Sequence, residues 1–170
     1  MFYDPTNGEE EIYYEGANGD LDMSYWRGGN LGFLDLGMKV TASPAAMYDG
    51  TEEVYFRGSS GDLTEFAWGA PTDPLDLGHQ MLGTPAVFYD PTNGEEEIYY
   101  EGANGDPDMS YWKGGSLGFF DLGMQTCASP AALLNTADGE EETYFCNSNG
   151  DLTEGYWGSG YQFLDLGTTF

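Results

Sequence analysis

Apolar and aromatic side chains occur along this chain in short alternating runs rather than at helical spacing. Typical runs are EIYYEG at Glu11, EVYFRG at Glu53, EIYYEG at Glu97 and ETYFCN at Glu142. No stretch shows a sustained apolar period near 3.6 residues, as an amphipathic helix would. Dipeptides such as Asn-Gly, Gly-Asp and Gly-Gly separate the runs and favour tight hairpin turns. The pattern therefore predicts an all-β protein built from short strands.

These runs belong to an internal repeat. Residues 2–46 and 88–132 differ at only seven positions, which indicates duplication of a unit of about 86 residues. Each half divides again, so that the chain consists of four segments of about 42 residues. The segments are 1–43, 44–84, 85–129 and 130–170.

Each segment contains the same four predicted strands. The opening strand is seen in PAAMYD, PAVFYD and PAALLN, and the second strand is the alternating run. A Gly-Asp turn leads to the third strand, which ends in a tryptophan: Trp26, Trp68, Trp112 or Trp157. The fourth closes on LDLG or FDLG, at 34–37, 75–78, 120–123 and 164–167. A repeat of about 42 residues that contains four short strands is typical of a propeller blade. We expect one β-propeller domain of four four-stranded blades, with the tryptophans packed between blades.

The sequence leaves the number of blades in the closed ring open. A four-bladed ring from a single chain is slightly favoured. The alternative is an eight-bladed ring made by a homodimer, because open sheet edges invite pairing with another chain.

The charge of the chain limits its partners. The net charge is −26 with only four Lys and Arg residues, so a basic surface for nucleic acid or for an anionic membrane is not expected. No apolar run is long enough to span a membrane, and the N-terminus lacks the pattern of a secretory signal. Three explanations of the excess of acidic residues remain. The protein functions at high salt, it binds calcium, or it has a soluble surface whose charges repel one another. The expected location is extracellular or at the cell surface.

Acidic loops are the candidate calcium ligands. They are DPTNGEEE at Asp4 and Asp90, DGTEE at Asp49 and ADGEEE at Ala137. They lack the alternate spacing of acids in an EF-hand loop, and Asp-Pro and Asn-Gly are ordinary turn signals. The turn interpretation is favoured, so no metal site and no cofactor are predicted, with calcium as the alternative.

Catalytic chemistry is not indicated. The chain has a single histidine, His79, which excludes a repeated Ser/Cys–His relay or a histidine-based metal site. The aspartates of the LDLG-type motifs recur fourfold, whereas catalysis needs an asymmetric set of groups. They are expected to cap turns or tie blades together: Asp35, Asp76, Asp121 and Asp165. The protein is therefore expected not to be an enzyme.

The two cysteines, Cys127 and Cys146, have Thr41 and Arg57 as their counterparts in the first half. Since one half folds without them, two unpaired cysteines are favoured over a disulfide.

Two motifs resemble those of known lectins. The pattern G-x-[LI]-T-E-x-x-W, at Gly61–Trp68 and Gly150–Trp157, resembles the repeat of the fungal and bacterial fucose-binding propeller lectins. EVYFRGSSGDLTEFAW, followed by LG and by TPAV or SPAA, resembles the repeat of the seven-bladed Photorhabdus-type bacterial lectins. The resemblance implies a carbohydrate-binding propeller with shallow sites between neighbouring blades and glycans as partners. The alternative is a non-catalytic structural or assembly module that binds protein partners or copies of itself.

The resemblance to the fucose lectins also implies site residues. Glu65 and Glu154 would bind sugar hydroxyls, and Trp68, Trp157, Trp26 and Trp112 are the aromatic candidates for stacking. Arg57 completes the candidate set. At the position of the family's sugar-binding arginine this chain has Glu11, Glu53, Glu97 and Glu142. Met23 and Met109 replace the Thr-Glu glutamate in the other two segments, so at most two sites of the family's kind are expected.

Overall fold

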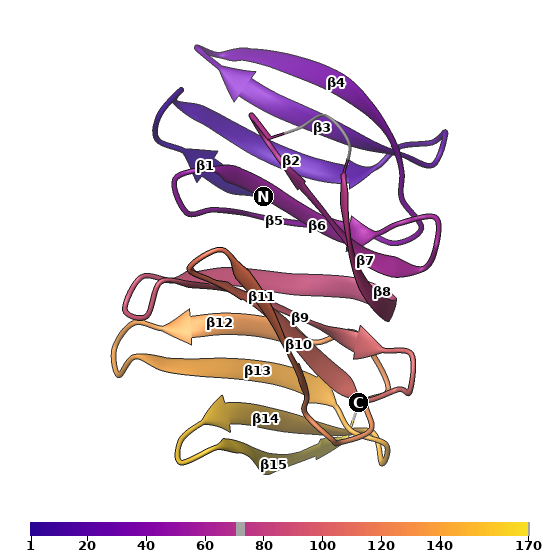
Figure 1. Ribbon diagram of the computed structural model, residues 1–170, viewed down its shortest axis with the longest axis vertical. Helices are drawn as coiled ribbons and strands as arrows, with labels where there is room; N and C mark the ends of the chain where they lie inside the picture. Colours follow the sequence, from indigo (N-terminus) through magenta and orange to yellow (C-terminus); the bar gives the residue numbers. More distant parts are fainter. Residues whose placement is uncertain (71–73, 170) are drawn as a thin grey trace. The chain divides into compact units, whose positions relative to one another are not determined.

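The computed structural model describes residues 1–70 and 74–169. Residues 71–73 and 170, at positions within the second and fourth predicted segments, lie outside the described residues. Every regular element in the described parts is a β-strand (Figure 1). The chain divides into two units, Met1–Thr84 and Pro85–Phe170, which coincide with the two duplicated halves. No helix in the described ranges is long and apolar enough to cross a membrane.

The first unit contains two antiparallel sheets. The strands of its first sheet pair in chain order: β1 (Phe2–Asp4), β2 (Glu9–Glu15), β3 (Asp20–Arg27) and β4 (Asn30–Lys39). Its second sheet consists of β5 (Ala45–Tyr48), β6 (Glu52–Arg57), β7 (Asp62–Ala67) and the beginning of β8 (Leu75–Asp90).

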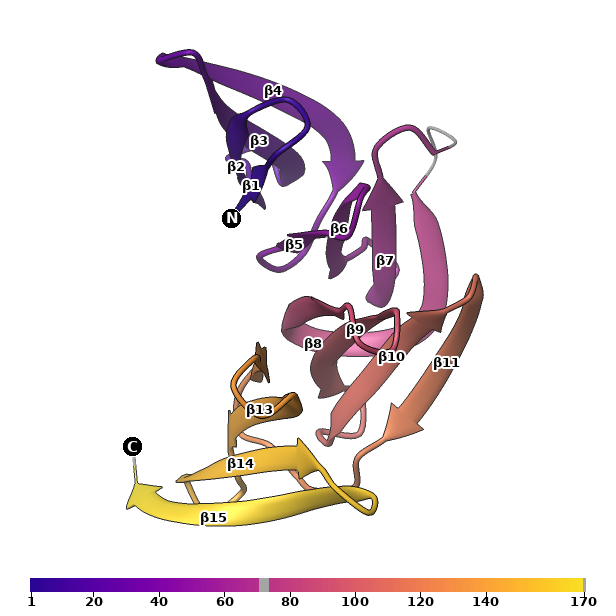
Figure 2. The ribbon, with the colours of Figure 1, turned by 90° about the vertical axis from the view of Figure 1, so that its left-hand side faces the viewer.

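The second unit repeats this arrangement. Its first sheet contains the end of β8, β9 (Glu95–Gly102), β10 (Pro107–Lys113) and β11 (Ser116–Asp121), and through β8 it belongs to one seven-stranded sheet with β5, β6 and β7. Its second sheet contains β12 (Ala131–Asn135), β13 (Glu140–Cys146), β14 (Asp151–Trp157) and β15 (Tyr161–Thr169), drawn orange to yellow in Figure 2.

Strand β8 differs from the sequence expectation. The second segment's closing strand and the third segment's opening strand were expected as separate elements, but they form one continuous strand. Gln80 pairs with Asp62 of β7, and the strand runs on through Pro85 to Asp90 beside β9. Proline favours an extended conformation in the residue before it, so Thr84 continues the strand.

The aspartates of the LDLG-type motifs cap local turns within their strands, as the sequence predicts. The backbone N–H of each motif's glycine donates a hydrogen bond to the aspartate Oδ1, for example from Gly37 to Asp35 at 2.8 Å. The other three pairs are Gly78–Asp76, Gly123–Asp121 and Gly167–Asp165. Gly37 has φ of 70°, a conformation that side chains strongly disfavour. The register of β3 and β4 shifts beside this motif, which indicates a β-bulge.

The apolar core of each unit lies between its two sheets. In the first unit, Tyr13, Leu21 and Met23 of the first sheet pack with Val54 and Phe56 of the second. In the second unit the buried group is Tyr99, Met109 and Leu122. Met23 and Met109 are therefore packing residues. The thioether side chain fits where the Thr-Glu motif has a carboxylate.

Two of the four repeated tryptophans pack between sheets as expected. Trp68 and Trp157 lie against the cores of the first and second unit, respectively. Trp26 does not, because its side chain is 46% exposed on the outer face of the first sheet. The repeat gives every tryptophan the same strand position but not the same neighbours.

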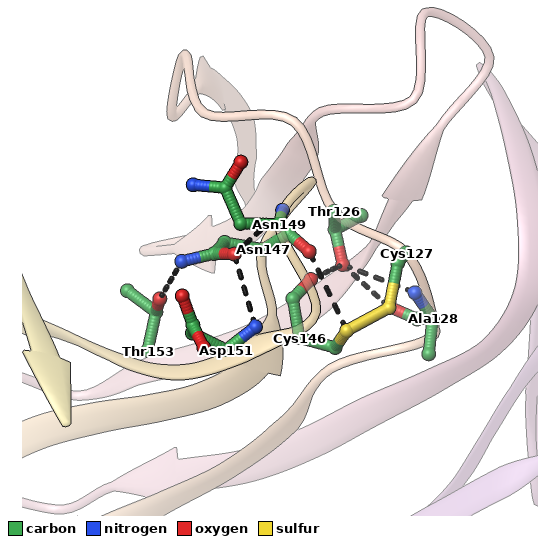
Figure 3. The surroundings of a disulfide bond; sticks show 8 residues. All are labelled: Thr126, Cys127, Ala128, Cys146, Asn147, Asn149, Asp151 and Thr153. Atoms are coloured by element: carbon green, nitrogen blue, oxygen red, sulfur yellow. Dashed lines mark hydrogen bonds between the residues drawn. A yellow bond between two sulfur atoms is a disulfide. The ribbon is translucent and has the colours of Figure 1, made fainter. Parts of the chain in front are cut away.

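The structure contains a disulfide between Cys127 and Cys146, so the expectation of two unpaired cysteines is wrong (Figure 3). The Cα atoms are 5.3 Å apart, and the Cys127 N–H donates to the Cys146 carbonyl at 2.8 Å. The counterparts in the first unit make the same backbone contact, from the Thr41 N–H to the Arg57 carbonyl at 2.9 Å. In both halves the fold thus places the backbone of position 41 or 127 beside that of position 57 or 146, whether the side chains are cysteines or not.

Asp108 on β10 is expected to reduce stability as the pH rises. Its side chain is buried, its Oδ1 has no hydrogen-bond partner among the described residues, and burial together with Asp121 and Asp106 raises its pKa to about 7. A carboxyl whose pKa is raised in the folded state stabilises that state most at low pH. This stabilisation should be lost between about pH 4 and pH 7.

We therefore expect Asp108→Asn to stabilise the protein by about 1 kcal/mol at pH 8 and by much less at pH 4. Thermal unfolding of both proteins at the two pH values measures this. An equal effect at both would show that the charge of Asp108 is not responsible.

Candidate functional site

Each unit has a pocket between its two sheets, and the two pockets are built from equivalent residues. The first-unit pocket, about 240 Å³, is lined by Asn7, Glu9, Glu11, Met23, Arg27, Glu52 and Trp68. The second-unit pocket, about 380 Å³, is lined by Asn93, Glu95, Met109, Tyr111, Lys113, Phe120, Glu141 and Trp157. Both therefore offer one tryptophan, one methionine, one cation, an asparagine and at least two carboxylates.

The DPTNG loop positions one carboxylate of each site. In the first unit the Asp4 carboxylate accepts hydrogen bonds from the Thr6 N–H at 2.7 Å and from the Thr6 hydroxyl. The Gly8 N–H donates to the Asp4 carbonyl at 2.9 Å, with Gly8 at φ of 75°. These bonds form a tight turn and hold the Asp4 side chain in the interior, where it is 1% exposed. Asp90 has the same bonds to Thr92.

A chain of hydrogen bonds joins the tryptophan to a buried glutamate. In the second unit the indole N–H of Trp157 donates to the Tyr99 hydroxyl at 3.1 Å, which donates to Glu97 Oε2 at 2.7 Å. In the first unit Trp68 donates to Tyr13 at 2.6 Å, and Tyr13 donates to Glu11 at 3.0 Å. The polar edge of each indole is thus fixed inside the protein, while the same side chain lines the pocket.

Three carboxylates converge beside each pocket. In the second unit they belong to Asp90, Glu97 and Glu141, and each contributes one oxygen to a group within 4.8 Å. Burial raises the pKa of Glu97 to about 9, reinforced by contact with the carboxyl of Glu141. Burial also raises the pKa of Glu141.

The first unit has the equivalent group, formed by Asp4, Glu11 and Glu52. There, burial and repulsion by the Glu11 carboxylate raise the pKa of Glu52 to about 8. Like charges this close disfavour ionisation, and none of the ion pairs found among the described residues involves either group.

The cation of each pocket lies at the rim. Arg27 forms an ion pair with Glu9, and Lys113 forms one with Glu95. Both cationic side chains are more than half exposed, at 64% and 57%, whereas their glutamate partners are largely buried. A ligand in the pocket would thus meet a donor-rich rim and an acceptor-rich interior.

The sequence-predicted site residues are only partly brought together. Trp68 and Trp157 line the two pockets, whereas Glu65 and Glu154 line neither of them. Glu154 and Trp157 are three residues apart on β14, so they point to opposite faces of the sheet. Glu154 instead accepts a hydrogen bond from the Tyr144 hydroxyl at 3.4 Å.

Other candidate residues lie elsewhere. Trp26 lines a separate open cavity with Tyr3 and Glu10 on the outer face of the first sheet. Trp112 has the same strand position in the second unit, paired across the sheet with Glu96 and Leu117.

Arg57 is at the end of β6 away from Glu52, and its Nε donates to the Met81 carbonyl at 2.7 Å. It therefore stabilises the closing strand of its sheet and does not line the first-unit pocket.

Several pocket residues were not predicted as part of a sugar site. Glu52 and Glu141 belong to the acidic loops considered for calcium, and they come from the second sheet of each unit, 45 and 48 residues from the asparagines Asn7 and Asn93 that they contact. Arg27 and Lys113 were also missed. The sequence could have indicated them, because Arg27 and its counterpart Lys113 differ between the two halves and yet both are positively charged.

Comparison with solved structures shows that the chain has a β-propeller fold. It matches the Aleuria aurantia lectin in complex with alpha-methyl-L-fucoside with a TM-score of 0.74 and 16% identity, over 98% of this chain and 59% of that one. It matches the BP39L lectin from Burkholderia pseudomallei with a TM-score of 0.73 and 14% identity, over 96% and 52%. It matches the SapL1 lectin in complex with alpha methyl fucoside with a TM-score of 0.69 and 18% identity, over 94% and 60%.

The chain thus spans little more than half the length of these lectins. No protein-family model matches the sequence, and no curated protein matches it either. The class of fold is therefore that of the fucose-specific propeller lectins, which confirms this resemblance at the level of the fold. The structural neighbours are lectins rather than enzymes, which agrees with the expectation of a non-catalytic protein.

Proposed function

We propose that this protein is a carbohydrate-binding lectin with one site in each of the two pockets. The observation that carries the proposal is the duplicated pocket, in which an anchored tryptophan stands beside carboxylates, an asparagine and an exposed cation. An aromatic side chain matches the C–H face of a sugar ring, and the surrounding polar groups bind hydroxyls and fix orientation. The fold supports the proposal, since matched structures are named as lectins in complex with fucosides.

In this proposal the residues have distinct roles. Trp68 and Trp157 stack on the sugar ring. Arg27 and Lys113 donate hydrogen bonds to sugar hydroxyls from the rim of the pocket. Glu9 and Glu95 accept hydrogen bonds from sugar hydroxyls. Two weak sites on one chain would gain strength by binding a glycan surface together. The partners are glycans, and the place of action is extracellular or at the cell surface.

Ring closure is part of the proposal. The chain supplies four blades, with boundaries at 1–43, 44–84, 85–129 and 130–170, which close alone or combine with a second chain into a ring of eight. The outer face of the first sheet exposes Phe33 (66%), Trp26 and Leu31 (46% each), and such a face favours contact with another sheet. The same exposed face favours the second candidate function, an assembly module that binds copies of itself or another protein.

A glycan array with and without calcium tests the lectin function. We expect binding to a narrow set of glycans, weakened about tenfold by Trp157→Ala or Trp68→Ala because each removes one stacking surface. Trp26→Ala is the matched control, since Trp26 lines neither pocket, and it should leave binding unchanged. Circular dichroism verifies that each variant is folded.

A blank array from folded protein would reject the lectin proposal. If the mass of the protein then rose with concentration, the assembly module would become the leading function. Turnover of a chromogenic glycoside would contradict both.

A further inference from the structure

We propose that each group of three converging carboxylates binds one divalent cation, and that calcium is the ion it fits best. The two sites are Asp90, Glu97 and Glu141 in the second unit and Asp4, Glu11 and Glu52 in the first. This inference goes beyond carbohydrate binding and does not depend on it.

The geometry of the groups suits one ion. The three ligand oxygens of each group lie within 4.8 Å of one another. Calcium binds oxygens at about 2.3–2.6 Å, so oxygens on either side of one ion are separated by up to about 5 Å. All three ligands are carboxylates, which hard cations prefer, and neither group contains a thiol or an imidazole.

In the second unit, an unpaired buried oxygen is the second, independent sign of a ligand. The first-unit group is assigned by its equivalence in the repeat, in which Glu11 corresponds to Glu97. Glu97 is fully buried at 0% exposure, and its Oε1 has no hydrogen-bond partner among the described residues. Its other oxygen, Oε2, is already engaged by the Tyr99 hydroxyl at 2.7 Å. A buried carboxyl oxygen without a partner is unfavourable, and a bound cation would supply that partner. Oε1 is therefore the atom free to serve as the group's ligand.

Positive groups near the sites are engaged elsewhere. Lys113 pairs with Glu95 and Arg27 with Glu9, at the exposed rim of each pocket. The Asn93 amide donates to Glu141 at 3.3 Å, which neutralises no charge.

The remaining coordination positions are open to solvent. Calcium takes six to eight oxygen ligands, and three carboxylates supply between three and six of them. Glu52 and Glu141 line the pockets themselves, so water can reach the ion from the pocket side. Both sites combine ligands from two sheets. An ion would therefore link the sheets of each unit.

Terbium luminescence tests the proposal, because Tb³⁺ occupies calcium sites and Trp68 and Trp157 are close enough to sensitise it. Chelator-treated protein at physiological salt should bind two Tb³⁺ ions, which Ca²⁺ displaces. Glu97→Gln and Glu11→Gln should each weaken one site at least tenfold, and the double variant should lose both. Glu15→Gln, which removes an exposed charge from β2, is the matched control and should keep both sites.

Thermal unfolding with and without calcium separates a loss of ion binding from a folding defect in the variants. Calcium should raise the midpoint of the wild type and of Glu15→Gln, but not that of the double variant. In chelator the double variant should be at least as stable as the wild type, because glutamine cannot ionise and still accepts the tyrosine hydrogen bond. Binding that is unsaturable, or equally strong in the double variant and in Glu15→Gln, would overturn the proposal. Such a result would mean that the ions bind to the acidic surface without a specific site.

Discussion

Removing the disulfide is expected to destabilise the second unit by about 3 kcal/mol and to leave the first unit unchanged. Cys127 and Cys146 are 19 residues apart, and a cross-link of this span removes conformational entropy from the unfolded chain equivalent to about 3 kcal/mol. The bond joins the segment before β12 to the end of β13, so it constrains the last sheet of the chain (Figure 3). Its loss should therefore expose β12 and β13 first.

Hydrogen exchange of Cys127→Ser/Cys146→Ser, compared with the wild type, locates the effect. We expect faster exchange in β12 and β13, and unchanged exchange in the equivalent strands β5 and β6. There, Thr41 and Arg57 hold the same backbone contact without a cross-link. A reducing agent should reproduce the effect in the wild type and do nothing further to the double variant. Uniform destabilisation of both units would contradict a local role for the bond.

Replacing Tyr99 by phenylalanine is expected to cost about 2–3 kcal/mol, although only one oxygen atom is removed. The Tyr99 hydroxyl accepts the indole N–H of Trp157 and donates to Glu97, and Tyr99 is fully buried. Phenylalanine leaves the indole donor unpaired and takes the remaining donor from a buried carboxylate. Unpaired buried groups are more costly than the average hydrogen bond is stabilising.

Tyr100→Phe provides the matched control for this prediction. Tyr100 is equally buried, but among the described residues its hydroxyl bonds to the neutral Ser110 hydroxyl alone, at 3.0 Å. We expect a loss of about 1 kcal/mol there. Chemical denaturation compares the two variants, and Trp157 fluorescence should shift only in Tyr99→Phe. Equal losses in both would mean that the chain from Trp157 to Glu97 adds nothing beyond an ordinary buried hydrogen bond.

The sequence already determines the all-β class and the duplicated plan, because both depend on local patterns. Alternation of side chains and regular turn signals identify strands, and the near-identity of residues 2–46 and 88–132 identifies the repeat. The capping role of Asp35 and its three counterparts was also predictable, since it involves a backbone N–H only two residues away. Strand β8 was misjudged because an extended Pro85 continues a strand that the repeat pattern divides.

The site depended on contacts that local patterns do not encode. Trp68 and Trp157, which the repeat marks, line the pockets, whereas Glu65 and Glu154 share their motif and yet do not line them. Motif neighbours an odd number of residues apart on a strand face opposite sides. The motif alone does not show which side is a pocket.

Only the tertiary structure decided which acidic side chains meet. The sequence shows thirty acidic residues with spacing typical of turns. Packing of two sheets brings Glu141 to Asp90 and Glu97, and pairs Cys127 with Cys146. Each contact joins residues that are distant in sequence, and its geometry is fixed by strand register and sheet packing. Composition and spacing therefore determined the architecture of this protein, and the packing of its sheets determined its chemistry.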